Sequence, residues 1–479
     1  MSSLTRLAAL APLATALACA QNTATSSAPA PAPAPSATSA ATAAASTSAP
    51  LNIPVVYEKL PNGLKVVLSE DHTAPIVTVA AYYNIGFRIE PRDRTGFAHL
   101  FEHMMFQGSQ NLGKLELIQL VQKNGGVLNG STRFDYTNYF EIVPAHKLET
   151  FLWAEADRMR GLAITQENLT NQQGVVKSEV RVNVLNTPYG GFPWLDMPQY
   201  ANTNWYNAHN FYGDLKDLDA ATLDDVASFF KTYYAPNNAV LVVVGDFRAA
   251  DAMQMVRKYF SDIPAQPQPA KVDLAEPRQE KEKRANKPDP LATRPALGIA
   301  WHVPARNTPE WYAMGLIDQI LAQGRDSWFY QELVQKRGLT GGVNAGINIG
   351  LGNQFNYNGP MLWTVSLFHD SDKSADTILT AIESQIERLR TTPVDQATLD
   401  RARVKMRSNL YDTIDQFFGF GRADLLASYA LFDDDPNGVN RIESEFAKVT
   451  PEIIQRTAQE YLRTTNRTVL TIEPGKKGS

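Results

Sequence analysis

Short apolar runs separated by turn signals recur along the chain, and they predict strands that alternate with helices. Residues 60–68 hold the dipeptide Asn62-Gly63 between two apolar runs, a pattern typical of a tight hairpin. Another apolar run, residues 239–244, follows a helix-like stretch with aromatic residues at 224–234. Strands at the start of each half, with helical patterns between them, favour an α+β fold.

The end of the chain repeats part of this arrangement. Residues 466–471 follow a helical pattern at 451–461, and Asn466 aligns with Asn237 in front of the earlier run. We interpret the two runs as terminal strands of two like domains, although these segments alone are equally compatible with a chance similarity. Between the halves, a stretch rich in Pro, Lys and Glu predicts a solvated linker over residues 265–293.

The most informative polar residues lie in one predicted helix. From Phe97 onward no residue breaks the helical pattern, and His99 and His103 stand four residues apart, so they share one face. Glu102 lies beside the same face. Two imidazoles that can hold one metal ion, next to a carboxylate that is not a ligand, are typical of a zinc hydrolase. The alternative is a helix with two surface histidines and a solvated glutamate.

A catalytic zinc ion usually takes three protein ligands and leaves one position for water. Glu179 is a candidate for the third ligand, because it lies in a plausible helix at 171–181. Most glutamates are surface residues with no such role. The residues alone do not distinguish it from Glu141, Glu155 or Glu167.

This pattern resembles the insulinase/pitrilysin family of zinc metallopeptidases, the inverzincins. The family pairs H-x-x-E-H with a glutamate ligand about as far downstream as Glu179 lies from His103, which is 76 residues. The resemblance extends from about Val55 to the C-terminus. It includes residues 125–132, which are similar to the family's substrate-binding edge strand. There Asn129 would lie beside the scissile bond, although a strand-edge asparagine without that role is the alternative.

The resemblance implies both a fold and a function. It implies two related domains, each a mainly antiparallel sheet with a helix layer, that face each other across a cavity. His99, His103 and Glu179 would bind Zn²⁺, and Glu102 would act as general base for the water that attacks a peptide carbonyl. An extended peptide substrate is expected to pair its backbone with the edge strand.

Some positions depart from the family's pattern. Gln172 stands where relatives often carry a second acidic residue. Val334 and Gly341 stand where fully equipped members place an Arg and a Tyr that grip the substrate opposite the zinc. Other candidates are nearby but in the wrong register, and we expect them to be helix-surface residues: Arg325, Tyr330 and Arg337.

These departures predict a partner. In two-subunit members of the family, such as the mitochondrial processing peptidase, one chain carries the metal motif and a similar chain without it completes the chamber. This chain is similar to the zinc-bearing subunit, and its length allows two large domains. We therefore expect a heterodimer with a homologous chain that lacks H-x-x-E-H, with a homodimer as the second possibility.

The N-terminus is expected to lie outside the fold. Residues 1–18 contain an Ala/Leu-rich run that suits a signal peptide and is short for a membrane span. Cys19 follows Ala-Leu-Ala, which is similar to a bacterial lipobox and predicts a lipid anchor in the periplasm; ordinary signal cleavage is the alternative. The predicted organisation is a signal peptide at 1–18, an uncharged Ala/Ser/Thr/Pro tether at 19–50, a zinc-bearing catalytic domain at 51–264, a linker at 265–293 and a second domain at 294–479.

Composition narrows the classes of function. The net charge is −5 and the chain has no basic block, which argues against nucleic-acid binding. Cys19 is the only cysteine, so neither an internal disulfide nor a multi-thiolate metal site is available. Two rivals to an exported zinc endopeptidase remain. One is a non-catalytic scaffold of the same fold, and the other is a lipoprotein that binds metal or peptide without hydrolysis.

Overall fold

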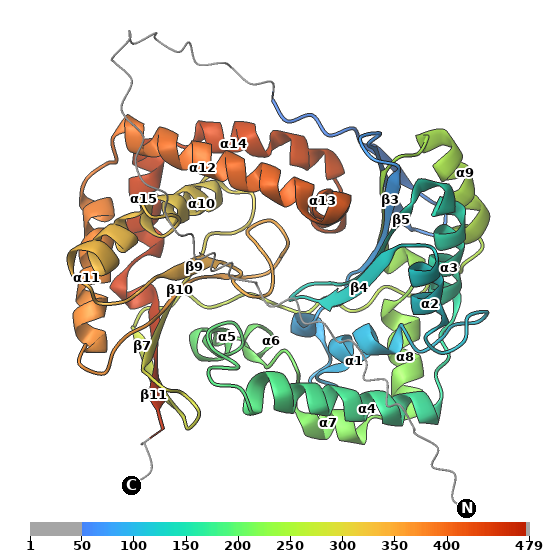
Figure 1. The fold of residues 1–479 in the computed structure, drawn as a ribbon, viewed down its shortest axis with the longest axis horizontal. Helices are drawn as coiled ribbons and strands as arrows, with labels where there is room; N and C mark the ends of the chain where they lie inside the picture. Colours follow the sequence, from blue (N-terminus) through green and yellow to red (C-terminus); the bar gives the residue numbers. More distant parts are fainter. Residues whose placement is uncertain (1–49, 476–479) are drawn as a thin grey trace, which may run out of the picture. The chain divides into compact units, whose positions relative to one another are not determined.

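Two β-sheets organise residues 50–475, the part of the chain that the computed structural model describes (Figure 1). The first sheet has the strand order β1-β2-β6-β3-β5-β4 and the second has the order β7-β11-β8-β10-β9. Most neighbouring strands are antiparallel, so the predicted α+β architecture with mainly antiparallel sheets is confirmed. The strands are β1 Val56–Lys59, β2 Lys65–Glu70, β3 Ile76–Tyr83, β4 Val127–Thr132, β5 Thr137–Pro144, β6 Ala239–Gly245, β7 Lys283–Asp289, β8 Ala296–His302, β9 Asn344–Ile347, β10 Leu362–Phe368 and β11 Arg467–Pro474.

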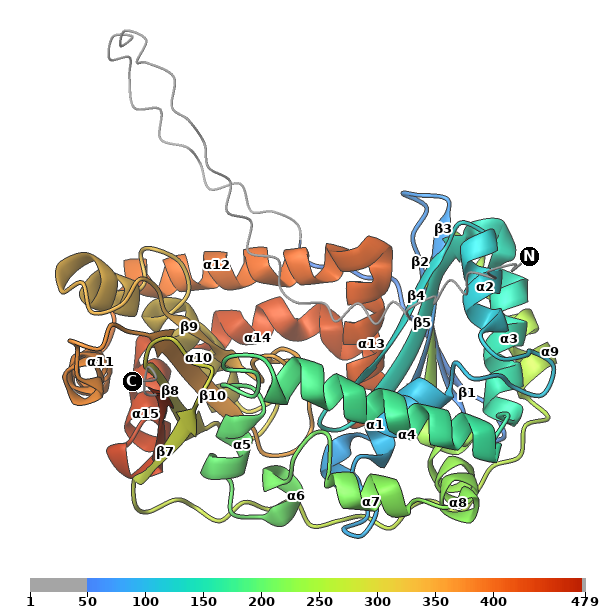
Figure 2. The ribbon, with the colours of Figure 1, turned by 60° about the horizontal axis from the view of Figure 1, so that its bottom comes forward.

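Helices surround these sheets in both views of the ribbon (Figures 1 and 2). None of the helices between residues 50 and 475 combines the length and the apolar character that crossing a membrane requires. The predicted signal peptide and Cys19 lie outside the described residues. The α-helices are α1 Phe97–Met104, α2 Glu116–Lys123, α3 Leu148–Arg160, α4 Gln166–Val180, α5 Asp196–Ala201, α6 Trp205–Ala208, α7 Leu215–Ala220, α8 Leu223–Tyr233, α9 Ala249–Phe260, α10 Pro309–Leu321, α11 Ala375–Thr391, α12 Gln396–Asp415, α13 Phe420–Asp433, α14 Ile442–Lys448 and α15 Pro451–Tyr461.

The two sheets repeat one topology. Strands β2, β6, β3, β5 and β4 of the first sheet correspond in order to β7, β11, β8, β10 and β9 of the second. The directions agree as well, because β2–β6 and β7–β11 are the parallel pairs and the other corresponding pairs are antiparallel. This agreement supports the internal repeat far more strongly than the short sequence match does.

The structure corrects the alignment of that repeat by one residue. The side-chain amide of Asn238 donates to the carbonyl oxygen of Tyr233 at 2.9 Å, and that of Asn466 donates to the carbonyl oxygen of Tyr461 at 2.7 Å. Asn466 therefore corresponds to Asn238, and the predicted match with Asn237 is wrong. Two adjacent asparagines are interchangeable in a sequence comparison, whereas only one reaches the end of the preceding helix.

The hairpin predicted for residues 60–68 is confirmed. Strands β1 and β2 pair in antiparallel register, with Lys59 opposite Lys65. Gly63 adopts φ 89° at the turn, and a Cβ atom there would lie 2.5 Å from the Cβ of Asn237. Both the backbone conformation and the close approach therefore require glycine.

The predicted linker is wrong in its second half. Residues 283–289 form β7, which pairs in parallel with β11 at the edge of the second sheet. Its side chains alternate between half-buried and exposed positions, and several of them are charged. A charged edge strand has no apolar pattern to reveal it, because it is held mainly by backbone hydrogen bonds to one neighbour.

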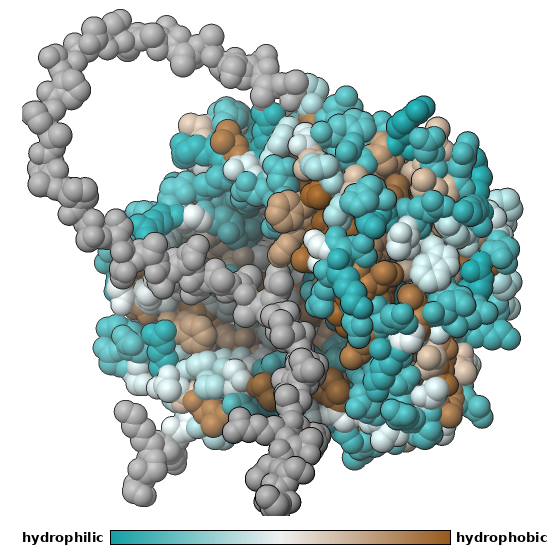
Figure 3. Space-filling model, turned by 45° about the vertical axis from the view of Figure 1, so that its right-hand side comes forward, coloured by the Kyte–Doolittle hydropathy of each residue, from teal (hydrophilic) through white to brown (hydrophobic). Residues whose placement is uncertain are grey.

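The first sheet is buried on both faces. In β6, Leu241 and Val243 belong to the core beneath helices α1, α3, α8 and α9, while Val240 and Val242 point into a second core. Helix α13 from the second half contacts β6, β3 and β2 on that side (Figure 1). The sheet that ends in β4 is thus packed on both of its faces. On the face shown in Figure 3, hydrophilic residues predominate and apolar ones lie between them.

Candidate metal centre

Helix α1 has an apolar face and a polar face, as the sequence predicts. Phe97 and Phe101 are fully buried, and the ring of Phe101 stacks on that of Phe229 with 4.8 Å between centroids. His99 and His103 project from the other side, and α1 contacts both α4 and β4. The packing of the phenylalanines therefore sets the direction of the two imidazoles.

A buried carboxylate fixes the start of α1. Glu90 accepts hydrogen bonds from the backbone N–H of Gly96 at 2.9 Å and from that of Ala98. Anions are stabilising at this position because the first N–H groups of a helix have no partner within the helix. Sequence reasoning missed Glu90, because it lies six residues before Gly96 and not at a capping position.

Three side chains that could hold a metal ion converge between α1 and α4. Nε2 of His99 lies 3.6 Å from Oε1 of Glu179, and Nε2 of His103 lies 3.2 Å from Oε2 of Glu179. The candidate ligand atoms all lie within 4.8 Å of one another. In a tetrahedral zinc site with bonds of about 2.0–2.1 Å, neighbouring ligand atoms are about 3.3 Å apart. The spacing and the donor types therefore fit zinc.

The protonation states are also suited to metal binding at two of these residues. Burial, together with the neighbouring His103, lowers the pKa of His99, which favours the neutral imidazole that a metal requires. Burial alone would raise the pKa of Glu179, but its hydrogen bond with His103 and the two histidine charges outweigh that effect and lower it. For His103 burial lowers the pKa, but the hydrogen bond with Glu179 and the charges of Glu102 and Glu179 together raise it above its ordinary value.

Neighbouring groups orient the two histidines in different ways. Nε2 of His103 lies 3.2 Å from Oε2 of Glu179, and the buried side chain of Gln172 helps to raise the pKa of that imidazole, a role that its sequence position did not reveal. Nδ1 of His99 is buried and has no hydrogen-bond partner among the described residues. Packing therefore holds that ring, since the centroids of Phe211 and Tyr212 each lie 5.1 Å from its own.

The other glutamates that the sequence left open are placed elsewhere. Glu141 and Glu155 are buried together against Arg158, to which both are ion-paired. The side chain of Glu167 is 86% exposed at the start of α4. Of the four candidates, only Glu179 faces the histidines.

Glu102 lies beside the three candidate ligands and is not one of them. Its Oε2 accepts a 2.8 Å hydrogen bond from the hydroxyl of Thr132 at the end of β4. A Cβ atom on Gly130 would lie 3.3 Å from Cγ of Glu102, so the carboxylate stands directly against this strand. The exposed residue Asn129 is next in β4, and its Oδ1 accepts from the backbone N–H of Gly130 at 2.9 Å.

In the second half, Tyr330 and Arg337 are out of register with the Arg and Tyr of the family pattern. Each contacts a residue of its own helical segment. Val334 lies in the π-helical segment Tyr330–Lys336. Nε of Arg337 is 2.6 Å from Oε1 of Glu332, and the hydroxyl of Tyr330 accepts from Gln335 at 3.3 Å. These contacts are those of helix-surface residues.

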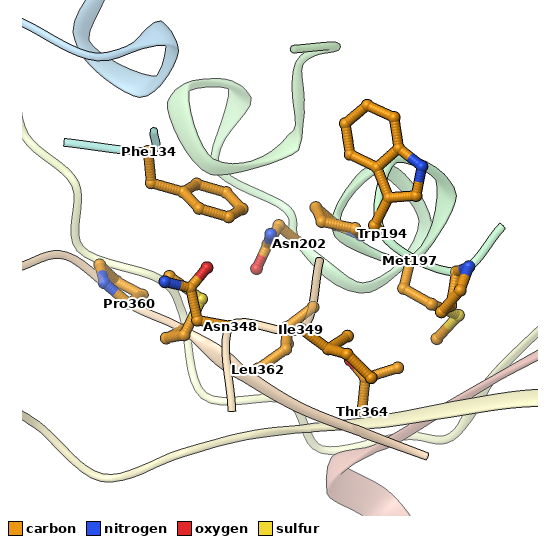
Figure 4. A pocket seen from close by; sticks show the side chains of 12 residues that line it. Phe134, Trp194, Met197, Asn202, Asn348, Ile349, Pro360, Leu362 and Thr364 are labelled. Carbon is orange, nitrogen blue, oxygen red and sulfur yellow. The ribbon is translucent and has the colours of Figure 1, made fainter. Parts of the chain in front are cut away.

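Cavities elsewhere in the described residues do not include the predicted site. A cavity of about 20 Å³, room for about one water molecule, lies between Phe134 and Trp194 on one side and Asn348 and Leu362 on the other (Figure 4). A larger cavity of about 410 Å³ is bordered by His302. No candidate metal ligand lines either of these two cavities.

Two family models match the chain. The model described as "Insulinase (Peptidase family M16)" matches residues 65–195, which include all four residues of the candidate centre. The model described as "Peptidase M16 inactive domain" matches residues 220–406. The first match covers strands β2 to β5 together with helices α1 and α4, which carry the candidate centre. The second match begins before β6 and extends into the second sheet.

Similar proteins and structures agree with these matches. The zinc protease PqqE of Helicobacter pylori is 26% identical over 429 residues, which cover 87% of this chain and 92% of that protein. A probable mitochondrial-processing peptidase subunit beta of Arabidopsis thaliana is 24% identical over 43% of this chain and 39% of its own length. The crystal structure of a protease from Helicobacter pylori has a TM-score of 0.81 at 24% identity, covering 88% of this chain and all of that one. For the periplasmic protease PqqL from Escherichia coli the TM-score is 0.71 at 17% identity, with 90% of this chain and 48% of that chain covered.

Proposed function

Because the chain belongs to the insulinase (M16) family of peptidases, we propose that it is an exported, zinc-dependent endopeptidase that hydrolyses extended peptides. The observation that carries the proposal is the convergence of His99, His103 and Glu179 within 4.8 Å, with Glu102 beside them. A scaffold has no need of this complete set.

The residues of the proposed site have different roles in hydrolysis. Zinc held by His99, His103 and Glu179 would supply Lewis acidity toward water and the substrate carbonyl. Glu102 accepts the proton of the attacking water and returns it to the leaving amine. Thr132 holds one oxygen of that carboxylate by hydrogen bonding, which leaves the other oxygen for the proton.

Strand β4 is the proposed docking edge for the substrate. It ends the first sheet, so its outer N–H and C=O groups are available for pairing with an extended peptide. A peptide paired there passes Glu102 at Gly130, next to Asn129. Asn129→Ala is therefore expected to lower kcat/KM without lowering the zinc content.

Zinc content and peptide hydrolysis test the proposed function together. The purified chain should hold one zinc and cleave an internally quenched peptide, and a chelator should abolish cleavage until zinc is restored. Glu179→Gln should lower both zinc content and activity. Glu167→Gln, on the same helix but 86% exposed, is the matched control and should change neither. Full zinc and full activity in Glu179→Gln would eliminate Glu179 as a ligand.

A non-catalytic scaffold or a peptide-binding lipoprotein of the same fold is the second candidate function. The match to the inactive-domain model favours it, but that match covers residues 220–406, which contain none of the three candidate ligands. Zinc without hydrolysis would identify a binding protein, and neither zinc nor hydrolysis would identify a scaffold.

We also propose that the chain works as a heterodimer with a homologous chain that lacks H-x-x-E-H, a homodimer being the second possibility. Three observations support a partner. This chain covers only 48% of PqqL, and other similar proteins are named as subunits of mitochondrial-processing peptidase. Val334 and Gly341 also leave the second half without the Arg and Tyr of the family pattern. Full activity of the isolated chain, without gain from a candidate partner, would contradict the heterodimer.

The proposed location is the periplasm, with Cys19 as a lipid-modified N-terminus. The lipobox-like sequence supports it, and PqqL is named a periplasmic protease. Fractionation of cells that express Cys19→Ala tests the anchor, since the variant should leave the membrane fraction. Unchanged membrane association would argue against lipidation.

A further inference from the structure

We infer that Tyr212 is a positioning residue of the metal centre: its hydroxyl orients the carboxylate of Glu179 and thereby strengthens zinc binding. The inference rests on the proposed function and extends it to a residue outside the H-x-x-E-H motif. It also assigns a role to the segment before α7, which the sequence did not single out.

Tyr212 contacts two of the three candidate ligands. Its hydroxyl donates a hydrogen bond to Oε1 of Glu179 at 3.1 Å. Its ring meets the imidazole of His99 edge-on, with 5.1 Å between centroids and 80° between planes. Burial, together with the charge of Glu179, raises the pKa of Tyr212 above that of an ordinary phenol, so its hydroxyl stays protonated and remains a donor to the carboxylate.

The hydrogen bond gives the two oxygens of Glu179 different surroundings. Oε1 lies 3.1 Å from the hydroxyl of Tyr212 and 3.6 Å from Nε2 of His99, while Oε2 lies 3.2 Å from Nε2 of His103. A carboxylate that binds a metal through one oxygen can accept a hydrogen bond at the other, and such a bond limits its rotation. Tyr212 therefore restricts the rotation of the Glu179 carboxylate before zinc binds. Less conformational entropy is then lost when zinc binds, so binding is tighter.

The backbone next to Tyr212 is fixed against the start of α1. A Cβ atom on Gly96, which precedes α1, would lie 2.5 Å from the carbonyl oxygen of Tyr212. A Cβ atom on Gly213 would lie 2.3 Å from the backbone nitrogen of Gly96. Both glycines have positive φ, 82° and 67°, so this close approach leaves no room for other residues. The hydroxyl is thus placed relative to α1 as well as to α4.

The test is the zinc affinity of Tyr212→Phe, measured by competition with a chelator of known affinity. This variant keeps the ring on His99 and removes the hydroxyl, and we expect zinc to bind about 10–100-fold more weakly. Tyr259→Phe is the matched control, because the hydroxyl of Tyr259 also donates to a glutamate, Glu149 at 2.8 Å, on the exposed surface. It should leave the zinc affinity unchanged.

A double-mutant cycle separates positioning from a general structural effect. If Tyr212 acts through Glu179, adding Tyr212→Phe to Glu179→Gln should weaken zinc binding no further. A fully additive loss would overturn the inference, and so would wild-type affinity in the single variant Tyr212→Phe. A wild-type chain that binds no zinc would instead refute the proposed function itself.

Discussion

Replacing Glu102 by glutamine asks whether this carboxylate is the general base. Glutamine has the same shape, and its oxygen can still accept the 2.8 Å hydrogen bond from Thr132, so the side chain should stay against β4. Its amide cannot take up the proton of water. Removal of a general base typically costs ~10²–10⁴-fold in rate, which is about 3–5 kcal/mol in activation free energy.

The zinc content of Glu102→Gln should equal that of the wild type, because Glu102 is not among the three converging candidate ligands. The assay compares kcat/KM of the variant with that of the wild type on an internally quenched peptide, at equal zinc occupancy. Fluorescence anisotropy of a labelled peptide measures whether the inactive variant still binds substrate. Thr132→Val is a second variant of this test: it removes the hydroxyl that bonds to the charged carboxylate at 2.8 Å and to the carbonyl oxygen of Ala98 at 3.4 Å, and the lost bond to the carboxylate should cost about 1.5–3 kcal/mol or roughly 10–100-fold. Activity of Glu102→Gln within a few-fold of wild type would refute the assigned role, as would a loss of zinc large enough to explain the loss of activity.

Three further predictions concern the free energy of unfolding. Arg88→Met leaves the buried carboxylate of Asp135 without the cation 3.3 Å away, and should cost about 3–5 kcal/mol in urea denaturation; a cost below about 1 kcal/mol would contradict this. Burial raises the pKa of Asp318 to about 6 from 3.8, so its ionisation opposes folding as the pH rises through that window. The wild type should therefore lose about 2.4 kcal/mol relative to Asp318→Asn between pH 4 and pH 7, and a pH-independent difference between the two would show that Asp318 is not responsible. Glu90→Ala removes the carboxylate at the start of α1 and should lower stability by about 1–2 kcal/mol and weaken zinc binding, measured by thermal unfolding and zinc titration; unchanged values would exclude this capping role.

Local features were accessible to sequence reasoning because their geometry depends on neighbouring residues. Two histidines four apart on an unbroken helical pattern face the same way in any α-helix, and Glu102 follows with them. Asn62-Gly63 likewise specifies a turn through backbone preferences alone. The candidate third ligand was different: Glu179 was predicted from resemblance to a family and not from the residues themselves.

By itself, the sequence determined which face of α1 carries the candidate metal ligands, the first hairpin and the α+β class, since each follows from periodicity or turn chemistry within a few residues. Tertiary structure alone decided which glutamate meets the histidines, because α4 must pack on α1 before Glu179 is distinguished from Glu141. It also decided that Tyr212 reaches Glu179 and that a charged stretch becomes β7. These outcomes depend on contacts between residues far apart in the chain, and such contacts leave no local pattern of hydrophobic and polar residues.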